Sequence, residues 1–558
     1  MSLNIRRRSA AALLAGAAAI GLLATGCSSG GSGGSGDPAT LIAYTGQAGD
    51  YQINFNPFSP SRIGALGTIY EPLFFHNKAE VSDPVPLLGT ESAWNEDGTV
   101  LSVTLREGVE WSDGEAFTAE DVAFTFDMIK ANPAINTGGF DGEVAAVDDT
   151  HVTLTFAEPA FVRGPDLLST PIVPEHLWKD VNPAEDVMEE PVGTGAYLLD
   201  DFKPQAFTYK ANPDYWGGEP KVQQIRFLAL SGNQAGADAI AAGTIDWQTG
   251  PIPDIQNTHE NFPNYDAYTQ AQNQMVLASC SSADMGCEGP QTDPAVRQAL
   301  YYAMDRAQIN SLAFMDTASD MSPTFALTPS QDSFVSAAVT EKTVPTEPDT
   351  AKAAQLLEGA GWTKGDDGIY EQDGERLSLT IEVVTGWTDY ITAVDTIASQ
   401  AAAAGIEVKA AQSSWNEWTD KKGKGNFQLA IDSLWQGPTA DPYYLYNYFF
   451  DSSSGAAVGE AAGNNYSRYS NPAVDEAMDA LVQMPLDDAA ARQPYFDTIQ
   501  GEIVRDMPYI PILTGGTTSV WNTSKFSGWP SDDDLYAFPA VWSAFDAAEI
   551  FKHLEPQG

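Results

Sequence analysis

The stretch "LSLTIEVVTGWTDYITAVDTIASQAAAAGIEVKAAQ", residues 377–412, decides the fold class of this chain. Its beginning, "LSLTIEVV", and its end, "IEVKAAQ", are short runs rich in apolar and β-branched residues, which is the pattern of strands. Between them, "DYITAVDTIASQAAAAG" is long enough for a helix and carries apolar residues at helical spacing. A strand, a helix and a second strand in this order predict a crossover unit. The fold class is therefore mixed α/β with a partly parallel sheet.

Strand and helix patterns alternate along the rest of the chain as well. Residues 101–105 and 152–156 alternate apolar with polar side chains, which predicts half-buried strands. Thr118 is placed to cap a helix that carries Val122, Phe126 and Ile129 on one stripe. Two further helices are predicted to begin at Asp293–Pro294 and at Asn471–Pro472.

The N-terminus has the pattern of an export signal. Three arginines at 6–8 precede an apolar run over 10–24, and "LLATGC" then ends at Cys27. This predicts a signal peptide over residues 1–26. The small residues before Cys27 resemble a bacterial lipobox, which implies a lipid on Cys27 followed by a Gly/Ser tether over 27–37. We therefore expect an extracytoplasmic protein, lipid-anchored to the outer face of the cell membrane, the periplasmic side in a Gram-negative cell.

Composition restricts the classes of partner. The chain has 76 acidic and 28 basic residues, a formal net charge of −48. Such a charge favours solubility and argues against nucleic acid, whose binding depends on lysine and arginine. With 43% hydrophobic residues in 558, the chain has material for two or three globular domains.

Two cysteines lie close together in the middle of the chain. Cys280 and Cys287 close the short loop "CSSADMGC", which in an exported protein predicts a disulfide rather than two free buried thiols. The five histidines are scattered and none lies near this pair, so no metal and no cofactor is expected.

The segment "ADPYYLYNYFF", residues 440–450, concentrates six aromatic residues behind one carboxylate. Read as a helix, it places Tyr443 and Tyr446 on one face and Tyr444 and Tyr448 on another. One face is expected to be core, and tyrosines on the other suit the half-wet wall of a binding site.

Several segments together resemble one known family, the bacterial extracellular solute-binding proteins of family 5. These are binding components of ABC importers, typified by the dipeptide and oligopeptide binders. The resemblance covers most of the chain after the tether and is carried by "NFNPF", "IYEPLFF", "LREGVEWSDGEAFTAEDVAFTFD", "PVGTGAYLLDDF", "NPDYWGGEPKVQQIRF", "AGTIDW", "DPAVRQALYYAMDR", "AAQLLEGAGW" and "YSNPAVDEAMDALV".

The resemblance implies a two-lobed, hinged periplasmic-binding-protein fold of the large type, with the ligand enclosed between the lobes. Lobe I would comprise residues 38–75, 191–275 and 525–558. An extra subdomain would occupy 76–190, and lobe II would occupy 276–524.

The resemblance also implies a function. The chain would capture oligopeptides and deliver them to the permease and ATPase subunits of an importer, acting as a monomer and not as an enzyme. Some family members bind β-linked oligosaccharides, which stays open as the alternative ligand. A secreted glycoside hydrolase is the remote rival. The chain has neither G-x-S-x-G nor H-E-x-x-H, although carboxylate pairs cannot be judged from sequence.

Asp441 matches the position at which peptide binders pair a carboxylate with the α-ammonium group of the ligand. Asp before Pro442 is also a good helix N-cap, and the two roles are compatible. Aromatic walls suit sugar rings as well as peptide side chains, and amides can bond hydroxyl groups. The remaining candidate ligand-binding residues are Trp387, Trp415, Trp418, Trp435, Tyr444, Asn54 and Asn56.

Overall fold

The computed structural model describes residues 39–46, 49–59, 61–136, 138–250 and 252–557. The predicted signal peptide, the lipidation site Cys27 and the tether lie outside these residues. Across the described ranges, no helix combines the length and the apolar composition needed to cross a membrane.

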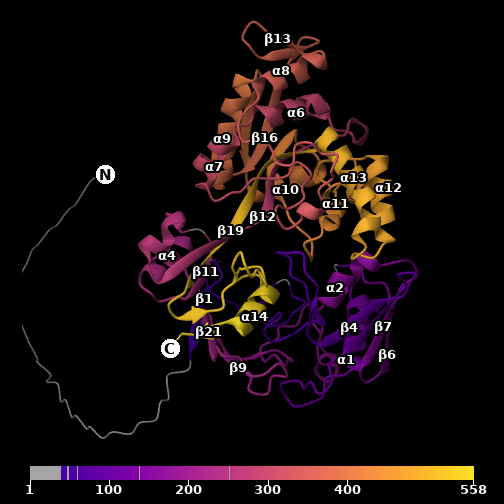
Figure 1. Cartoon of the computed structure of the whole chain (residues 1–558), viewed down its shortest axis with the longest axis vertical. Coiled ribbons are helices and arrows are strands. Elements are labelled where there is room, and N and C mark those ends of the chain that lie inside the picture. The colour runs from indigo at the N-terminus through magenta and orange to yellow at the C-terminus, as the bar shows by residue number, and fades with distance from the viewer. Residues whose placement is uncertain (1–38, 47–48, 60, 137, 251, 558) are drawn as a thin grey trace, which may run out of the picture. The chain divides into compact units, whose positions relative to one another are not determined.

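One ten-stranded sheet organises the chain (Figure 1). The predicted crossover is confirmed: β16 pairs in parallel with β17 from Ser378–Glu407 to Val384–Ser413, and helix α9 (Thr388–Ala403) connects them. The strands of the sheet, in spatial order, are β17 (Glu407–Ser413), β16 (Ser378–Val384), β18 (Leu429–Leu434), β12 (Tyr265–Ser279), β19 (Tyr509–Asn522), β11 (Trp247–Thr249), β1 (Thr40–Tyr44), β10 (Gln224–Leu228), β9 (Ala206–Ala211) and β8 (Tyr197–Lys203).

Two long strands, β12 and β19, belong to both halves of this sheet. The second part of β12 pairs with β18, whereas the end of β19 pairs with β11. Their own pairing shifts register between Ala271 and Asn273, opposite Gly515 and Gly516. A Cβ on Gly516 would lie 2.2 Å from a methyl carbon of Thr269, so this crossing has no room for a side chain. Figure 1 shows both strands running from the elements around β16 to those around β1.

The buried side chains form three large hydrophobic cores. The largest takes nearly all its members from residues 275–513, with Val162 as the exception. The second combines residues 41–247 with 521–554, and the third lies within 73–172. The lobe boundaries expected from the family resemblance remain a prediction.

The third core is covered by a four-stranded antiparallel sheet. Its strands are, in order, β4 (Gly89–Trp94), β5 (Val100–Leu105), β7 (His151–Thr155) and β6 (Glu143–Asp148), which confirms the two alternating strands predicted here. Helix α1 (Ala119–Ala131) begins after Thr118, whose backbone N–H donates to the Asp121 carboxylate at 3.0 Å. The predicted capped helix is therefore confirmed.

The other predicted helix starts are also confirmed. Asp293 accepts a hydrogen bond from the Ala295 N–H at 2.8 Å, and Asn471 accepts one from the Ala473 N–H at 2.9 Å. The remaining helices are α2 (Gly164–Leu168), α3 (Glu175–Trp178), α4 (Asn233–Ala241), α5 (Thr258–Asn261), α6 (Pro294–Ala303), α7 (Arg306–Phe314), α8 (Thr350–Gly359), α10 (Trp415–Lys424), α11 (Pro442–Phe449), α12 (Pro472–Val482), α13 (Ala489–Asp506) and α14 (Ala544–His553). Short strands are β2 (Phe74–Phe75), β3 (Val85–Pro86), β13 (Thr363–Lys364), β14 (Tyr370–Gln372), β15 (Glu375–Arg376), β20 (Phe526–Ser527) and β21 (Glu555–Pro556).

Cys280 and Cys287 form the predicted disulfide, with their Cα atoms 5.5 Å apart. Both cysteines are buried in the largest core, at the end of β12. The bridge therefore fixes the loop that leaves the central sheet toward α6.

Candidate ligand-binding site

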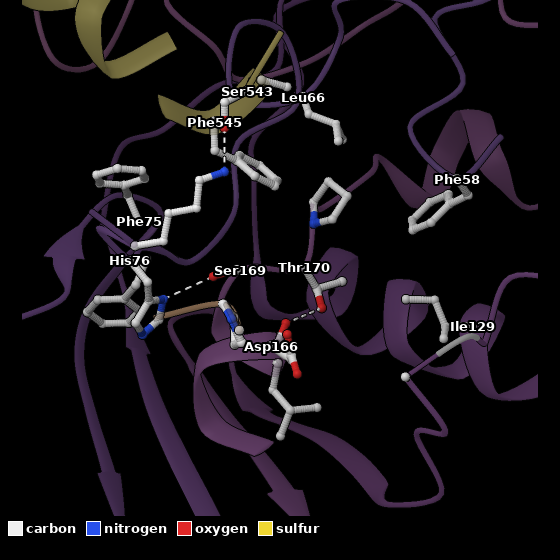
Figure 2. A pocket seen from close by; sticks show the side chains of 18 of the residues that line it. Phe58, Leu66, Phe75, His76, Ile129, Asp166, Ser169, Thr170, Ser543 and Phe545 are labelled. Carbon is white, nitrogen blue, oxygen red and sulfur yellow. Dashed lines mark hydrogen bonds between the residues drawn. The ribbon is translucent and has the colours of Figure 1, made fainter. Parts of the chain in front are cut away.

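A cavity of about 970 Å³ lies where segments of the three cores meet. Its volume is at the upper end of the range for small-molecule sites. Figure 2 shows the cavity with the side chains that line it. The lining comes from six segments, at residues 58–66, 74–78, 126–140, 163–171, 437–448 and 542–546.

Aromatic rings form much of the wall. Phe58, Phe75 and Phe545 come from segments far apart in the sequence and all line the cavity (Figure 2). Tyr448, near the end of α11, is half-buried and lines the cavity from the largest core. Such rings present flat apolar surface to a ligand, and tyrosine adds a hydroxyl group.

The close approach of α11 to the cavity wall depends on a glycine. A Cβ on Gly437 would lie 2.2 Å from the Cβ of Tyr444, so any side chain there would push the helix away. Gly437 and Pro438 themselves line the cavity. These two residues, which follow the end of β18, therefore shape the site directly.

His76 lies in the wall opposite Ser169, with its Nδ1 2.9 Å from the Ser169 hydroxyl oxygen (Figure 2). Burial lowers the pKa of His76 to about 4, because the charged imidazolium is disfavoured away from water. The ring is therefore neutral at neutral pH and contributes a hydrogen-bonding group rather than a charge.

Lys78 carries a charge that the protein itself neutralises. Its ammonium group donates to the Ser543 hydroxyl at 2.6 Å and lies 3.3 Å from the Asp546 carboxylate. It also lies 5.0 Å from the ring centre of Phe538. Lys78 thus connects the β2 segment to the start of α14.

Arg163 is neutralised in the same way. Its guanidinium donates to the Asp141 carboxylate at 2.7 Å and to the Gly139 carbonyl at 2.9 Å. Two other charged groups of the lining differ. Within the described ranges, Arg62 pairs with no carboxylate, and the Asp166 carboxylate accepts no hydrogen bond and pairs with no cation.

Asp441, the predicted ammonium partner, lies at the start of α11. Its carboxylate accepts from the Tyr443 N–H at 2.9 Å, which confirms the predicted N-cap. The same carboxylate pairs with both terminal nitrogens of Arg492, at 2.5 and 3.0 Å. Asp441 is 8% exposed and Arg492 is fully buried. A ligand ammonium would have to displace Arg492, so the ammonium role of Asp441 stays a prediction.

Asn54 and Asn56 are buried, and their amides bond protein groups. Asn54 donates to Ser59 at 3.0 Å and accepts from the Asn56 N–H. Asn56 donates to the carbonyls of Pro183 and Asp186 and accepts from the Phe58 N–H. In this structure the two amides hold the loop that brings Phe58 to the cavity. Because both amides are engaged with protein groups, their hydrogen bonds to ligand hydroxyls stay a prediction.

Tyr444 is also buried, in contrast to the half-wet position expected for it. Its hydroxyl donates to the Val162 carbonyl at 2.8 Å, and Val162 itself packs into the largest core. The side chain therefore joins two segments of the protein rather than facing the cavity.

The four predicted tryptophans follow the carboxyl ends of three parallel strands. Trp387, Trp415 and Trp418 form one cluster with ring centres 5.5 Å apart, in which Trp418 is buried and Trp415 is 54% exposed. Trp435, after β18, is 42% exposed and packs on Phe449. This edge of an open α/β sheet is where ligands commonly bind. None of the four is among the residues that line the cavity of Figure 2.

Sequence reasoning missed most of the cavity. Two segments singled out from the sequence reach the lining, "NFNPF" through Phe58 and "ADPYYLYNYFF" through Tyr448. The residues that it did not identify are Arg62, Phe75, His76, Lys78, Asp166 and Phe545. In the described part of the chain, no three His, Cys, Asp or Glu side chains gather as a metal site would require.

Comparison with known proteins identifies the family. The family described as bacterial extracellular solute-binding proteins, family 5 (middle region), matches residues 83–456. Protein XP55 of Streptomyces lividans is 32% identical over 425 residues, 74% of this chain and 73% of that protein. The oligopeptide-binding protein AppA of Bacillus subtilis (strain 168) is 26% identical over 427 residues, 74% and 75% of the two chains.

Solved structures agree in fold. A periplasmic oligopeptide-binding protein of Thermotoga maritima gives a TM-score of 0.83 at 23% identity, over 93% of this chain and 99% of that one. A second structure of the same protein, bound to mannohexaose, gives 0.74 at 24% identity, over 94% and 99%. These likenesses confirm the predicted fold class, the two-lobed α/β fold of the large periplasmic binding proteins. With the family match, they show that the chain belongs to family 5 of the bacterial extracellular solute-binding proteins.

Proposed function

We propose that this chain is the extracytoplasmic substrate-binding lipoprotein of an ABC importer and that it captures oligopeptides in the cavity of Figure 2. Family membership supports the binding role. The relative from Bacillus subtilis and the neighbour from Thermotoga maritima are both named as oligopeptide-binding proteins. A binding protein of this kind catalyses no reaction and releases its ligand unchanged.

The observation that carries the peptide assignment is the mixed character of the cavity wall. Aromatic rings alternate there with charged groups of both signs, Arg62 and Asp166 among them. An oligopeptide presents apolar side chains together with an ammonium and a carboxylate group. A neutral oligosaccharide would cover those charges and displace the water around them without supplying a counter-charge, which is costly.

Ligand capture in this proposal involves closure of two lobes about the crossing of β12 and β19. The lobes are those expected from the family resemblance, with residues 276–524 as the second lobe. The register shift opposite Gly515 and Gly516 supports a hinge at this place, since the pairing there is irregular. A ligand that contacts both lobes shifts the equilibrium toward the closed form.

Membrane attachment and transfer complete the proposal. A lipid on Cys27 and the Gly/Ser tether after it would keep the binding protein at the outer face of the membrane. There it would deliver the peptide, as a monomer, to the permease and ATPase subunits of the importer. The strongly acidic chain is suited to solubility in this compartment.

A β-linked oligosaccharide is the second candidate ligand. The exposed rings of Trp415 and Trp435 favour it, because sugar rings stack on flat aromatic surfaces. The mannohexaose-bound structure of the Thermotoga maritima protein shows that this fold accommodates an oligosaccharide in another protein. This candidate places the ligand against the tryptophan edge rather than against Arg62 and Asp166.

A melting experiment followed by mass spectrometry distinguishes the two ligands. The purified protein is incubated with a tryptic digest of casein, with mannohexaose or with cellohexaose, and the retained solute is identified. The proposal predicts that the digest raises the melting temperature and that a peptide is retained intact. At a concentration 100-fold above Kd, the ligand stabilises the fold by about 2.7 kcal/mol. Retention of a hexasaccharide alone would reject the peptide assignment, and cleavage of a retained solute would indicate an enzyme.

A further inference from the structure

Two opposite charges in the cavity wall have no counter-charge in the protein. Arg62 lines the cavity, and its guanidinium donates to the Ser59 carbonyl at 3.1 Å. Among the described residues it forms no ion pair. Burial lowers the pKa of Arg62, but a guanidinium remains charged at neutral pH.

Asp166 is the opposite charge. It belongs to the short helix α2 and lines the cavity, and Figure 2 shows its side chain near Thr170. The Thr170 hydroxyl bonds the backbone carbonyl of Asp166 at 3.1 Å, not its carboxylate. Arg163, three residues earlier, is committed to Asp141 and Gly139. The carboxylate thus remains available to a ligand.

The surroundings of Asp166 place it toward the ligand space. The side chain is exposed to the cavity, yet the surrounding protein raises its pKa by desolvation, against a weaker opposing effect of Arg163. Burial and then the negative charge of Asp166 raise the pKa of Tyr448 to about 12. Asp166 and Tyr448, near the end of α11, both line the cavity.

The other ionisable groups of the lining are already satisfied. Lys78 pairs with Asp546, and Arg163 pairs with Asp141. His76 is neutral at neutral pH because burial lowers its pKa to about 4. What the described lining presents to a ligand is therefore one unmatched cation and one unmatched anion.

We propose that Arg62 and Asp166 receive the two opposite charges of a zwitterionic ligand, Arg62 its carboxylate and Asp166 its ammonium group. This inference rests on the proposed function and names the residues that bind the charged ends of the ligand. Neither charge is marked by a family motif. A guanidinium binds a carboxylate through paired N–H donors, and a carboxylate accepts strong hydrogen bonds from an ammonium group.

The arrangement would also make the protein selective. A peptide with a blocked terminus covers one protein charge without supplying its partner, and sites of this kind reject such analogues strongly. Each charge should therefore be worth about 10- to 100-fold in affinity. The two contributions should be independent, because they involve opposite ends of the ligand.

The test uses one peptide that the protein retains from the casein digest. This peptide is synthesised in four forms: free, N-acetylated, C-amidated and blocked at both ends. Affinities are measured by titration calorimetry for the native protein and for the variants Asp166→Asn and Arg62→Gln. Asp180→Asn and Lys179→Gln, two exposed positions of the same region outside the cavity lining, are the matched controls for charge.

Asp166→Asn should weaken the free peptide about 10- to 100-fold and should leave the acetylated peptide unaffected. Arg62→Gln should weaken binding of the free peptide to a similar degree and should leave binding of the amidated peptide unaffected. The two control variants should bind every form of the peptide as the native protein does. If the acetylated and the free peptide bind all variants with equal affinity, the inference is overturned. The proposed function still stands in that case, because the protein has retained a peptide. If no peptide is retained, both are overturned. Circular dichroism of each variant excludes misfolding as the cause.

Discussion

Asp441 and Asp166 are two carboxylates in neighbouring regions of the molecule, and they differ in whether the protein supplies partners for their charge. Asp441 is buried, caps α11 and is held by both terminal nitrogens of Arg492. Asp166 faces the cavity, and its carboxylate has no partner among the described residues. A carboxylate at a recognisable sequence position thus serves the fold, whereas one without any motif is available to a ligand.

The largest expected effect concerns the buried pair. Asp441→Asn removes the charge that compensates Arg492 but keeps a residue that can cap α11. Loss of one partner of a buried ion pair costs about 3 kcal/mol or more of unfolding free energy. Urea unfolding measures it. Asp349→Asn, at the exposed N-cap of α8, is the matched control and should cost far less. An unchanged urea midpoint for Asp441→Asn would contradict the claim that Asp441 stabilises the fold through Arg492.

The disulfide provides a second structural element away from the cavity lining. Replacing Cys280 and Cys287 together by serine should lower the unfolding free energy by about 2 to 3 kcal/mol, through the greater entropy of the unfolded chain. Peptide affinity should be retained, because neither cysteine lines the cavity. A large loss of affinity with unchanged stability would show that the loop after β12 belongs to the binding site.

Asp166→Asn should change the stability of the ligand-free protein in the direction opposite to Asp441→Asn. The folded-state pKa of Asp166 is raised, so the ionised carboxylate costs stability at neutral pH and protonation relieves that cost. Removing the charge should therefore raise the melting temperature slightly. Solvent in the cavity screens the charge, so the gain should stay within about 0.5 kcal/mol. A clear fall in melting temperature would mean that Asp166 has a structural partner.

The smallest effect is expected at the tryptophan edge. Trp415 is 54% exposed, so Trp415→Ala should change the unfolding free energy by less than about 0.5 kcal/mol. If the ligand is a peptide held at Arg62 and Asp166, its affinity should be unchanged in fluorescence titration. A strong loss of affinity would instead favour an oligosaccharide stacked on the exposed rings.

Local signals predicted the parts of the fold that depend on local chemistry. The β16–α9–β17 crossover and the caps at Asp293 and Asn471 follow from side chains a few residues apart. The disulfide follows from two cysteines in one short loop of an exported chain. In each of these cases the interacting residues are near neighbours in sequence.

The ligand-binding residues are harder to predict because they depend on distant contacts. The cap by Asp441 was predictable from Pro442 beside it, but Arg492, which takes up its charge, is 51 residues away. The aromatic run at 440–450 was predicted to provide a core face and a wall, and in the structure Tyr448 supplies the cavity contact while Tyr444 is buried. Arg62 and Asp166 come to one cavity only through the packing of separate cores.

Hydrogen–deuterium exchange with and without the retained peptide tests directly whether the cavity is the ligand site. The account predicts slower exchange on binding in three separate segments, residues 58–66, 164–171 and 437–448, because each contributes to the lining. Protection of all three segments should rise together as the protein becomes saturated with peptide. Protection confined to residues 387–418, with these three segments unchanged, would place the ligand on the tryptophan edge and contradict the account.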